Sequence, residues 1–291
     1  MKELSYQQTS IQEIILPGSS AKLLVKREDL NHPFVSGNKW WKLKYNLVEA
    51  QRQGHDTLLT FGGAYSNHIF ATAAAAHEIG LKSIGIIRGE ETLPLNKTLS
   101  FAKNKGMQLH YVSRETYRIK TEKEFIERLK NQFGDFYLIP EGGTNELAVK
   151  GCAEFTTKLS KEIEFDYLCL PIGTGGTFAG IINGLGESKK IIGFPVLKGA
   201  EYLEGEIKSL LLHSKQNWFL NYDYHFGGYG KFNDGLLHFI KDAKEKYGLP
   251  LDKIYTAKMV YGVFDLIGKG YFHKGTSVLI VHTGGLQANY F

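Results

Sequence analysis

Short apolar runs alternate along the chain with longer segments of helical periodicity. Seven runs rich in branched or aromatic residues predict strands at residues 57–61, 83–88, 107–113, 135–140, 166–172, 190–196 and 277–282. Segments such as SNHIFATAAAAHEIG and NELAVKGCAEFTTKLSKEI lie between them and have the apolar spacing of helices. Strands that alternate with helices form βαβ units, which build a mostly parallel sheet buried on both faces. We therefore expect an α/β fold.

Glycine pairs follow directly after several of the predicted strands. They occur in FGG at 61–63, PEGG at 140–143, GTGG at 173–176 and HTGG at 282–285. In open α/β sheets, ligands bind beyond the carboxyl ends of the strands. Because glycine allows the backbone to approach a ligand closely, the four pairs predict one shared site.

Composition excludes several other classes of protein. The net charge of +5 comes from lysines and arginines that are mixed with acids, so we expect no nucleic-acid partner. No apolar run reaches the roughly 18 residues that predict a membrane span. Cys152 and Cys169 have neither the spacing of a zinc site nor that of a disulfide framework, and no metal is expected. The first residues lack the apolar core of a signal peptide, so we expect a cytoplasmic protein.

The segment PIGTGGTFAG predicts a phosphate site. Its loop consists of Gly173, Thr174, Gly175, Gly176 and Thr177, and a helix is expected to begin near Phe178. Backbone N–H groups converge in such a turn, and the helix N-terminus adds partial positive charge. The loop is not a Walker A motif, and Phe178 replaces the third glycine of the dinucleotide fingerprint. A tight turn without a ligand and a dinucleotide-binding oxidoreductase stay open as alternatives.

The segment VSGNKWWKLKYN at residues 35–46 contains a candidate reactive amine. Lys39 and Lys42 are three positions apart and share a helix face. Trp40 and Trp41 predict partly desolvated surroundings, which turn an ammonium into a usable amine.

A polar helix start follows the Gly-Gly turn at residues 62–63. Ser66 or Asn67 is expected to cap this helix, and its N-terminus also suits a carboxylate or phenolate oxygen. His68 and His77 are expected to be structural. A lysine amine, a phosphate site and a partner for a phenolic oxygen together match the needs of pyridoxal phosphate.

These motifs resemble those of the fold-type II pyridoxal phosphate enzymes. The segments KREDLNHPFVSGNKWWKLKYN, FGGAYSNH, PEGGTN, GTGGTFAG, GFPVLKG, LDKIYTAK and HTGG look most like the 1-aminocyclopropane-1-carboxylate deaminase and D-cysteine desulfhydrase family. The resemblance implies two open, twisted, mostly parallel-sheet domains with the cofactor between them. It implies a large domain of residues 1–42 and 146–291, a smaller one of 43–145, and a homodimer that acts on a small amino acid.

The resemblance also implies a role for each site residue. Lys39 would bond covalently to the cofactor's aldehyde, Lys42 and the loop Gly173 to Thr177 would hold the phosphate, and Asn67 would meet the phenolic oxygen. Ser66 would meet the substrate carboxylate or act as nucleophile or proton relay, Tyr229 and Tyr255 would approach the substrate, and Thr283 would lie near the pyridine nitrogen.

One position bears on the substrate. The resemblance places a glutamate after the tyrosine in the cyclopropane deaminases, where this chain has Thr256 after Tyr255. Neither Thr256 nor Thr283 can stabilise a pyridinium as an acid can, which weakens the cofactor as an electron sink. This favours β-elimination from D-cysteine to pyruvate, ammonia and hydrogen sulfide. Ring opening of 1-aminocyclopropane-1-carboxylate to 2-oxobutanoate and ammonia is the alternative.

Four residues depart from the family pattern. Tyr65 stands in place of glutamine and Phe70 in place of a basic residue, while Trp40 and Trp41 replace smaller or basic residues. These substitutions predict a bulkier, more apolar pocket. The substitutions at Tyr65 and Phe70 also keep open a non-catalytic pyridoxal phosphate-binding protein.

Overall fold

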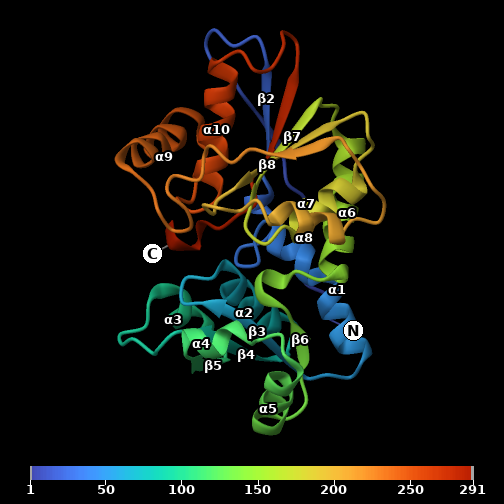
Figure 1. Cartoon of the computed structure of the whole chain (residues 1–291), viewed down its shortest axis with the longest axis vertical. Helices are drawn as coiled ribbons and strands as arrows, with labels where there is room; N and C mark the ends of the chain where they lie inside the picture. Colours follow the sequence, from blue (N-terminus) through green and yellow to red (C-terminus); the bar gives the residue numbers. More distant parts are fainter. Residues whose placement is uncertain (1, 290–291) are drawn as a thin grey trace.

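Two β-sheets organise residues 2–289, the part of the chain that the computed structural model describes (Figure 1). The six-stranded sheet has the order β1-β2-β10-β7-β8-β9, and only the pairing of β1 with β2 is antiparallel. The four-stranded sheet has the order β5-β4-β3-β6 and is parallel throughout. Each sheet has helices around it, which gives a large lobe and a small lobe (Figure 1).

The strands of the large lobe are β1 (Ile11–Ile14), β2 (Lys22–Lys26), β7 (Tyr167–Ile172), β8 (Lys190–Pro195), β9 (Trp218–Leu220) and β10 (Ser277–Val281). Those of the small lobe are β3 (Thr57–Gly63), β4 (Lys82–Arg88), β5 (Met107–Val112) and β6 (Tyr137–Ile139). The helices are α1 (Asn38–Arg52), α2 (Asn67–Ile79), α3 (Lys97–Asn104), α4 (Arg114–Arg118), α5 (Lys123–Phe133), α6 (Glu146–Glu162), α7 (Gly176–Gly184), α8 (Leu203–Ser209), α9 (Asp234–Tyr247) and α10 (Thr256–Gly268). Short 3₁₀ turns lie at η1 (Glu28–Leu30), η2 (Glu141–Gly143) and η3 (Leu286–Asn289).

The predicted α/β fold is confirmed, and all seven predicted strands are present as β3 to β8 and β10. Three strands were missed, namely β1, β2 and β9. The edge strands β1 and β9 are only 4 and 3 residues long and are partly exposed, so they lack the long apolar run of an interior strand. Central strands such as β7 are buried on both faces, and their sequences are apolar almost throughout.

Glycines on one face of α7 let this helix approach α6 closely. A Cβ atom at Gly180 would lie 2.4 Å from Cys152 Cβ, and one at Gly184 would lie 2.3 Å from the carbonyl oxygen of Ala153. Both positions therefore need glycine. This packing fixes the direction of α7, whose N-terminus begins the predicted phosphate site. Cys152 and Cys169 are both free and buried.

Helix α1 lies where the two lobes meet (Figure 1). The predicted domain boundary between residues 42 and 43 falls inside this helix. The strands of the two sheets fall on opposite sides of the predicted boundaries. The division into residues 1–42 with 146–291 and residues 43–145 itself stays a prediction.

Candidate active site

The predicted phosphate cradle at residues 173–177 lies against a loop of the other lobe. The loop at residues 173–177 follows β7, and η2 follows β6. The hydroxyl oxygens of Thr144 and Thr174 lie 2.7 Å apart, and a Cβ atom at Gly176 would lie 2.7 Å from Thr144 Cγ2. Gly175 has a φ of +75°, and no side chain caps α7. The first N–H groups of α7 therefore have no partner within the helix, as an anion site requires.

The helix begins at Gly176 rather than near Phe178. The first turn of α7 thus starts inside the glycine pair. This brings the helix N-terminus closer to the predicted phosphate site than the sequence pattern indicated.

Lys39 lies in the first turn of α1, beside this cradle. Its amine is 3.2 Å from Asn38 Oδ1, and Asn38 Nδ2 donates to Thr177 Oγ1 at 2.8 Å. Burial lowers the pKa of Lys39 to about 8, against the opposing influence of Cys152 and Asp252. A larger fraction of this amine is therefore neutral and nucleophilic at neutral pH than for an ordinary lysine.

Lys42 is fully buried and has different partners. Its amine donates to the carbonyl oxygen of Gly142 and, at 2.9 Å, to Thr144 Oγ1. Burial lowers the pKa of Lys42 to about 7, and the charge of Lys39 adds to the effect. Through Thr144, Lys42 is one hydrogen bond away from Thr174 of the cradle. Its direct contact with a phosphate stays a prediction.

His68 joins Lys39 and Lys42 in a group of three titratable side chains. Thr60 donates its hydroxyl to Ile139 O at 2.8 Å, so His68 Nε2 donates to Thr60 Oγ1 at 2.8 Å. His68 Nδ1 is buried and has no partner among the described residues. Burial, Lys39 and Lys42 hold the pKa of His68 well below its usual value. Since Lys39 disfavours the charge of Lys42, and both lysines disfavour the charge of His68, an anion such as a phosphate is the complement that the group lacks.

Ser66 is the N-cap of α2, and it is one of the two residues that were predicted to cap this helix. Its hydroxyl oxygen accepts the N–H groups of His68 at 3.2 Å and Ile69 at 3.3 Å, so its proton is left to donate. Asn67 Oδ1 accepts from the side-chain amide of Gln287 in η3. The side-chain NH2 group of Asn67 is therefore the group that would donate a hydrogen bond to a phenolic oxygen.

The predicted tyrosines lie together. The rings of Tyr229 and Tyr255 have centroids 6.0 Å apart at 72°. A Cβ atom at Gly173 would lie 3.1 Å from the Tyr255 ring, so Tyr255 borders the cradle. Burial, followed by the neighbouring Tyr229, raises the pKa of Tyr255 well above its usual value, and its phenol stays protonated.

The two threonines expected near the pyridine nitrogen are both buried. The Thr256 hydroxyl donates to Asp252 Oδ2 at 2.6 Å and accepts from Asp252 N–H at 2.9 Å. Both bonds join Thr256, the first residue of α10, to the turn just before this helix. Thr256 therefore serves the fold rather than a cofactor, and Thr283 stays the predicted partner of the pyridine nitrogen.

The expectation that Trp40 and Trp41 crowd the pocket is wrong. Their indole N–H groups donate to Ser5 O at 2.6 Å and to Glu28 Oε2 at 2.7 Å, and both rings pack on Tyr6. Residues one or two positions after Lys39 on a helix point to other faces. The tryptophans thus hold the N-terminal segment.

The other two departures, Phe70 and Tyr65, lie in different surroundings. Phe70 is buried and stacks on Phe101 of α3, with ring centroids 3.8 Å apart. It contributes to the packing of α2 on α3. Tyr65 is 68% exposed, on the loop before Ser66. Tyr65 is thus the one of the four departures that stands in the open beside a predicted site residue.

Comparisons with known proteins decide the cofactor. The family model described as "Pyridoxal-phosphate dependent enzyme" matches residues 4–284. This chain belongs to the pyridoxal-phosphate dependent enzyme family. The family uses pyridoxal phosphate, which confirms the cofactor prediction and removes the dinucleotide-binding oxidoreductase. The group of Lys39, Lys42 and His68 and the uncapped N-terminus of α7 fit this cofactor.

Several relatives carry names of activities. A putative 1-aminocyclopropane-1-carboxylate deaminase of Pyrococcus abyssi is 34% identical over 278 residues, which cover 90% of this chain and 84% of the relative. Another relative is a bifunctional D-cysteine desulfhydrase/1-aminocyclopropane-1-carboxylate deaminase of Arabidopsis thaliana, named as mitochondrial. It is 32% identical over 314 residues, which cover 99% of this chain and 78% of the relative. A solved structure described as an ACC deaminase homologue has a TM-score of 0.84 at 30% identity and covers 98% of this chain and 91% of its own. The match confirms the predicted fold type and the family of lyases and deaminases.

Four residues of the site were missed from the sequence. Asn38 joins Lys39 to Thr177, Thr144 joins Lys42 to Thr174, Gln287 contacts Asn67, and Asp252 fixes Thr256. Asn38 and Thr144 lie inside quoted motifs, so their position beside a lysine and a glycine pair could have indicated them. The described residues contain no group of three metal-ligating side chains and no helix long and apolar enough to cross a membrane.

Proposed function

We propose that this pyridoxal phosphate enzyme eliminates a β-substituent from a small amino acid, with D-cysteine as substrate and pyruvate, ammonia and hydrogen sulfide as products. The observation that carries the substrate choice is the residue after Tyr255. It is Thr256, whose hydroxyl is held by Asp252. Opening a cyclopropane ring needs a strong electron sink, whereas expulsion of a thiolate needs a weaker one.

The chain's own residues would divide the work as follows. Pyridoxal phosphate supplies, when bound, the electron sink for loss of the α-proton. Lys39 is the base, because burial lowers its pKa to about 8 and its amine can take up a proton near neutral pH. Asn38 orients this amine and ties it to Thr177 of the phosphate loop.

Ser66 and Tyr255 would act on the two ends of the substrate. The Ser66 hydroxyl retains its proton for the substrate carboxylate, and the N-terminus of α2 favours that negative charge. The Tyr255 phenol stays protonated because burial raises its pKa, so it can donate a hydrogen bond to the departing sulfur. Tyr229 stands beside it and would close the substrate side of the site.

The ring-opening deaminase is the second candidate. It is supported by the names of the Pyrococcus abyssi relative and of the bifunctional Arabidopsis thaliana relative. The two activities share the same cofactor and the same base, so one chain can carry both. They differ in what stands near the pyridine nitrogen.

A comparison of substrates tests the proposal. Purified protein loaded with pyridoxal phosphate would be given D-cysteine, L-cysteine, D-serine and 1-aminocyclopropane-1-carboxylate, with pyruvate, sulfide and 2-oxobutanoate measured. D-cysteine should be the best substrate by kcat/KM, and Lys39→Ala should abolish turnover. Lys44→Ala is the matched control, because Lys44 lies on the same helix as Lys39 but pairs with Glu154 of α6 at 2.6 Å, and this variant should leave turnover unchanged.

Faster formation of 2-oxobutanoate from the cyclopropane substrate would favour the second candidate. No product from any of the four substrates would contradict both and revive the non-catalytic alternative. A homodimer and a cytoplasmic location stay predictions. Light scattering on the purified protein would test the first.

A further inference from the structure

A buried lysine contacts the loop that carries Tyr229. Lys258 lies on α10 and is 1% exposed. Its amine donates to the carbonyl oxygens of His225 at 2.8 Å and Gly228 at 2.7 Å, and Val196 O lies at 3.5 Å. An ammonium has three N–H groups, so these three carbonyl oxygens can take all of them. Two of the three belong to the turn just before Tyr229.

This loop has an unusual backbone. Phe226, Gly227, Gly228 and Gly230 all have positive φ values, of 51°, 87°, 113° and 71°. Phe226 is not a glycine, and such a residue keeps a left-handed conformation only when surrounding contacts impose it. Tyr229 is 45% exposed. Its place beside Tyr255 therefore depends on how the backbone of the loop is held.

Helix α10 holds the loop along one face. Tyr261 packs on Phe226 with ring centroids 5.1 Å apart, and Asp265 accepts the Tyr224 hydroxyl at 2.7 Å. Lys258, Tyr261 and Asp265 are spaced at i, i+3 and i+7, which places them on a common side of the helix. The same helix begins immediately after Tyr255. One rigid element thus sets the positions of both tyrosines.

We propose that Lys258 is a positioning residue for the reaction, whose ammonium fixes the loop at residues 225–230 so that Tyr229 stands beside Tyr255 at the substrate. The inference rests on the proposed role of these two tyrosines. Lys258 touches neither substrate nor cofactor in this proposal. It acts through the backbone that carries Tyr229.

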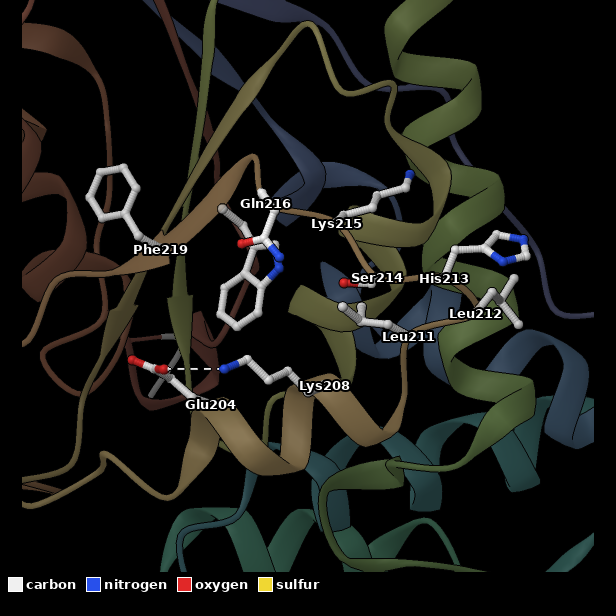
Figure 2. Close-up of a pocket in the computed structure, with 10 residues that line it drawn as sticks. Glu204, Lys208, Leu211, Leu212, His213, Ser214, Lys215, Gln216 and Phe219 are labelled. Carbon is white, nitrogen blue, oxygen red and sulfur yellow. Dashed lines mark ion pairs between the residues drawn. The ribbon is translucent and has the colours of Figure 1, made fainter.

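The same lobe contains a matched control. Lys215 donates to the carbonyl oxygens of Ile182 at 2.8 Å and Leu185 at 2.6 Å, with Asn183 O at 3.5 Å. Figure 2 shows Lys215 in the wall of a separate pocket, together with residues such as Leu211 and Phe219. Lys215 therefore makes the same kind of bonds at the far end of α7, with no part in the Tyr229 loop.

The test uses cofactor-loaded Lys258→Met and Lys215→Met. Lys258→Met should speed hydrogen exchange of the amides at 226–230 and lower kcat/KM for D-cysteine by about 100-fold, the scale of a 1 Å misplacement. The absorption spectrum of the bound cofactor should not change. Tyr229→Ala should lower kcat/KM by about the same factor. The double variant Lys258→Met/Tyr229→Ala should lower it no further than Tyr229→Ala does. Lys215→Met should lower the melting temperature without changing loop exchange or kcat/KM.

The proposal is overturned if the amides at 226–230 exchange at the wild-type rate in Lys258→Met. It is also overturned if the loss of kcat/KM in the double variant is the product of the two single losses. If Lys258→Met does not fold, Lys258→Gln replaces it. Glutamine is shorter and has only neutral amide donors, so loop protection and kcat/KM should both fall, and wild-type values of both would overturn the proposal. If the wild type turns over no substrate, the proposed function fails, while loop exchange still decides whether Lys258 anchors the loop.

Discussion

Lys39 and Lys42 differ in their surroundings although they lie one turn apart on one helix. Lys42 is 2% exposed and fixed by Gly142 and Thr144, whereas Lys39 is only half-buried and contacts Asn38. A fixed and buried amine suits a permanent donor near the phosphate. An amine with one weak partner is free to react.

The buried Lys42 predicts a particular dependence of stability on pH. Its pKa is about 7 in the folded protein without cofactor, against 10.5 ordinarily, so the unfolded chain binds more protons between these values. The free energy of unfolding should therefore rise with pH across this window. Lys42→Met lacks this contribution, so its stability relative to the wild type should fall by roughly 1 kcal/mol per pH unit between pH 7.5 and 9. Urea unfolding of both proteins without cofactor measures this.

Lys44→Met is the control for that prediction. Lys44 is paired with Glu154 at the protein surface, and its removal should shift stability by a similar amount at each pH. Parallel pH curves for Lys42→Met and the wild type would contradict the assigned pKa of Lys42.

At the scale of elements, the start of α7 is decisive for the cofactor. The loop before α7 needs Gly176, because a Cβ atom there would meet Thr144. Gly176→Ala should therefore weaken pyridoxal phosphate binding by about tenfold or more, a loss of about 1.4 kcal/mol, by pushing Thr144 and the loop apart. Fluorescence titration of the protein without cofactor measures the affinity.

A second alanine substitution shows whether the effect is local. Gly186 has no atom within 4 Å of its added Cβ, so Gly186→Ala should leave the affinity for pyridoxal phosphate unchanged. Equal affinities for Gly176→Ala and the wild type would show that the loop does not hold the cofactor as proposed.

Substitution of the α2 N-cap, compared with substitution of another N-cap, distinguishes an effect on activity from an effect on stability. Ser66→Ala removes the bonds to His68 and Ile69 and should cost about 1 kcal/mol of stability together with most of kcat/KM. Asn233→Ala removes the equivalent cap of α9, whose Oδ1 accepts Leu236 N–H at 2.9 Å, and should cost similar stability but no activity. Thermal melts and the D-cysteine assay measure the two effects. Similar kcat/KM values for both variants would contradict a substrate role for Ser66.

Local motifs and long-range contacts differed in how far the sequence predicted them. Interior strands and the loop at residues 173–177 were predicted, because burial on both faces and a turn at a helix start leave local patterns. The bond between Thr144 and Thr174 joins residues 30 apart, and that between Asn67 and Gln287 joins residues 220 apart. No local pattern reports such pairs. Adjacency in the sequence also gave a wrong prediction for Trp40 and Trp41, because these residues point to other faces of the helix than Lys39 does.

At the scale of the whole molecule, one aromatic contact and one hydrogen bond join the segment before α1 to the small lobe. Phe34, on the segment before α1, lies with its ring centroid 5.3 Å from that of Phe101 in α3. His32 on the same segment bonds Glu78 of α2 at 2.8 Å. These contacts connect the segment that leads to Lys39 with the small lobe, which carries Ser66 and Asn67. They should therefore set the distance between the two halves of the site.

Removal of Phe34 tests this coupling. Phe34→Ala should lower stability by about 1 kcal/mol, the worth of one aromatic pair, and raise KM for the substrate several-fold as the lobes separate. Phe219→Ala removes another partly exposed ring, far from the junction on β9, and should leave KM unchanged. Steady-state kinetics measure the difference, and equal KM values for the two variants would argue against coupling through Phe34.

The attachment point of the cofactor tests the central claim most directly. Borohydride reduction of the cofactor-loaded protein, followed by proteolysis and mass spectrometry, identifies the lysine that is bonded to pyridoxal phosphate. The half-buried amine of Lys39, with a pKa of about 8, should carry the whole modification, and Lys39→Ala should carry none. Modification of Lys42 instead, or a wild-type protein that binds no pyridoxal phosphate, would contradict the proposed site.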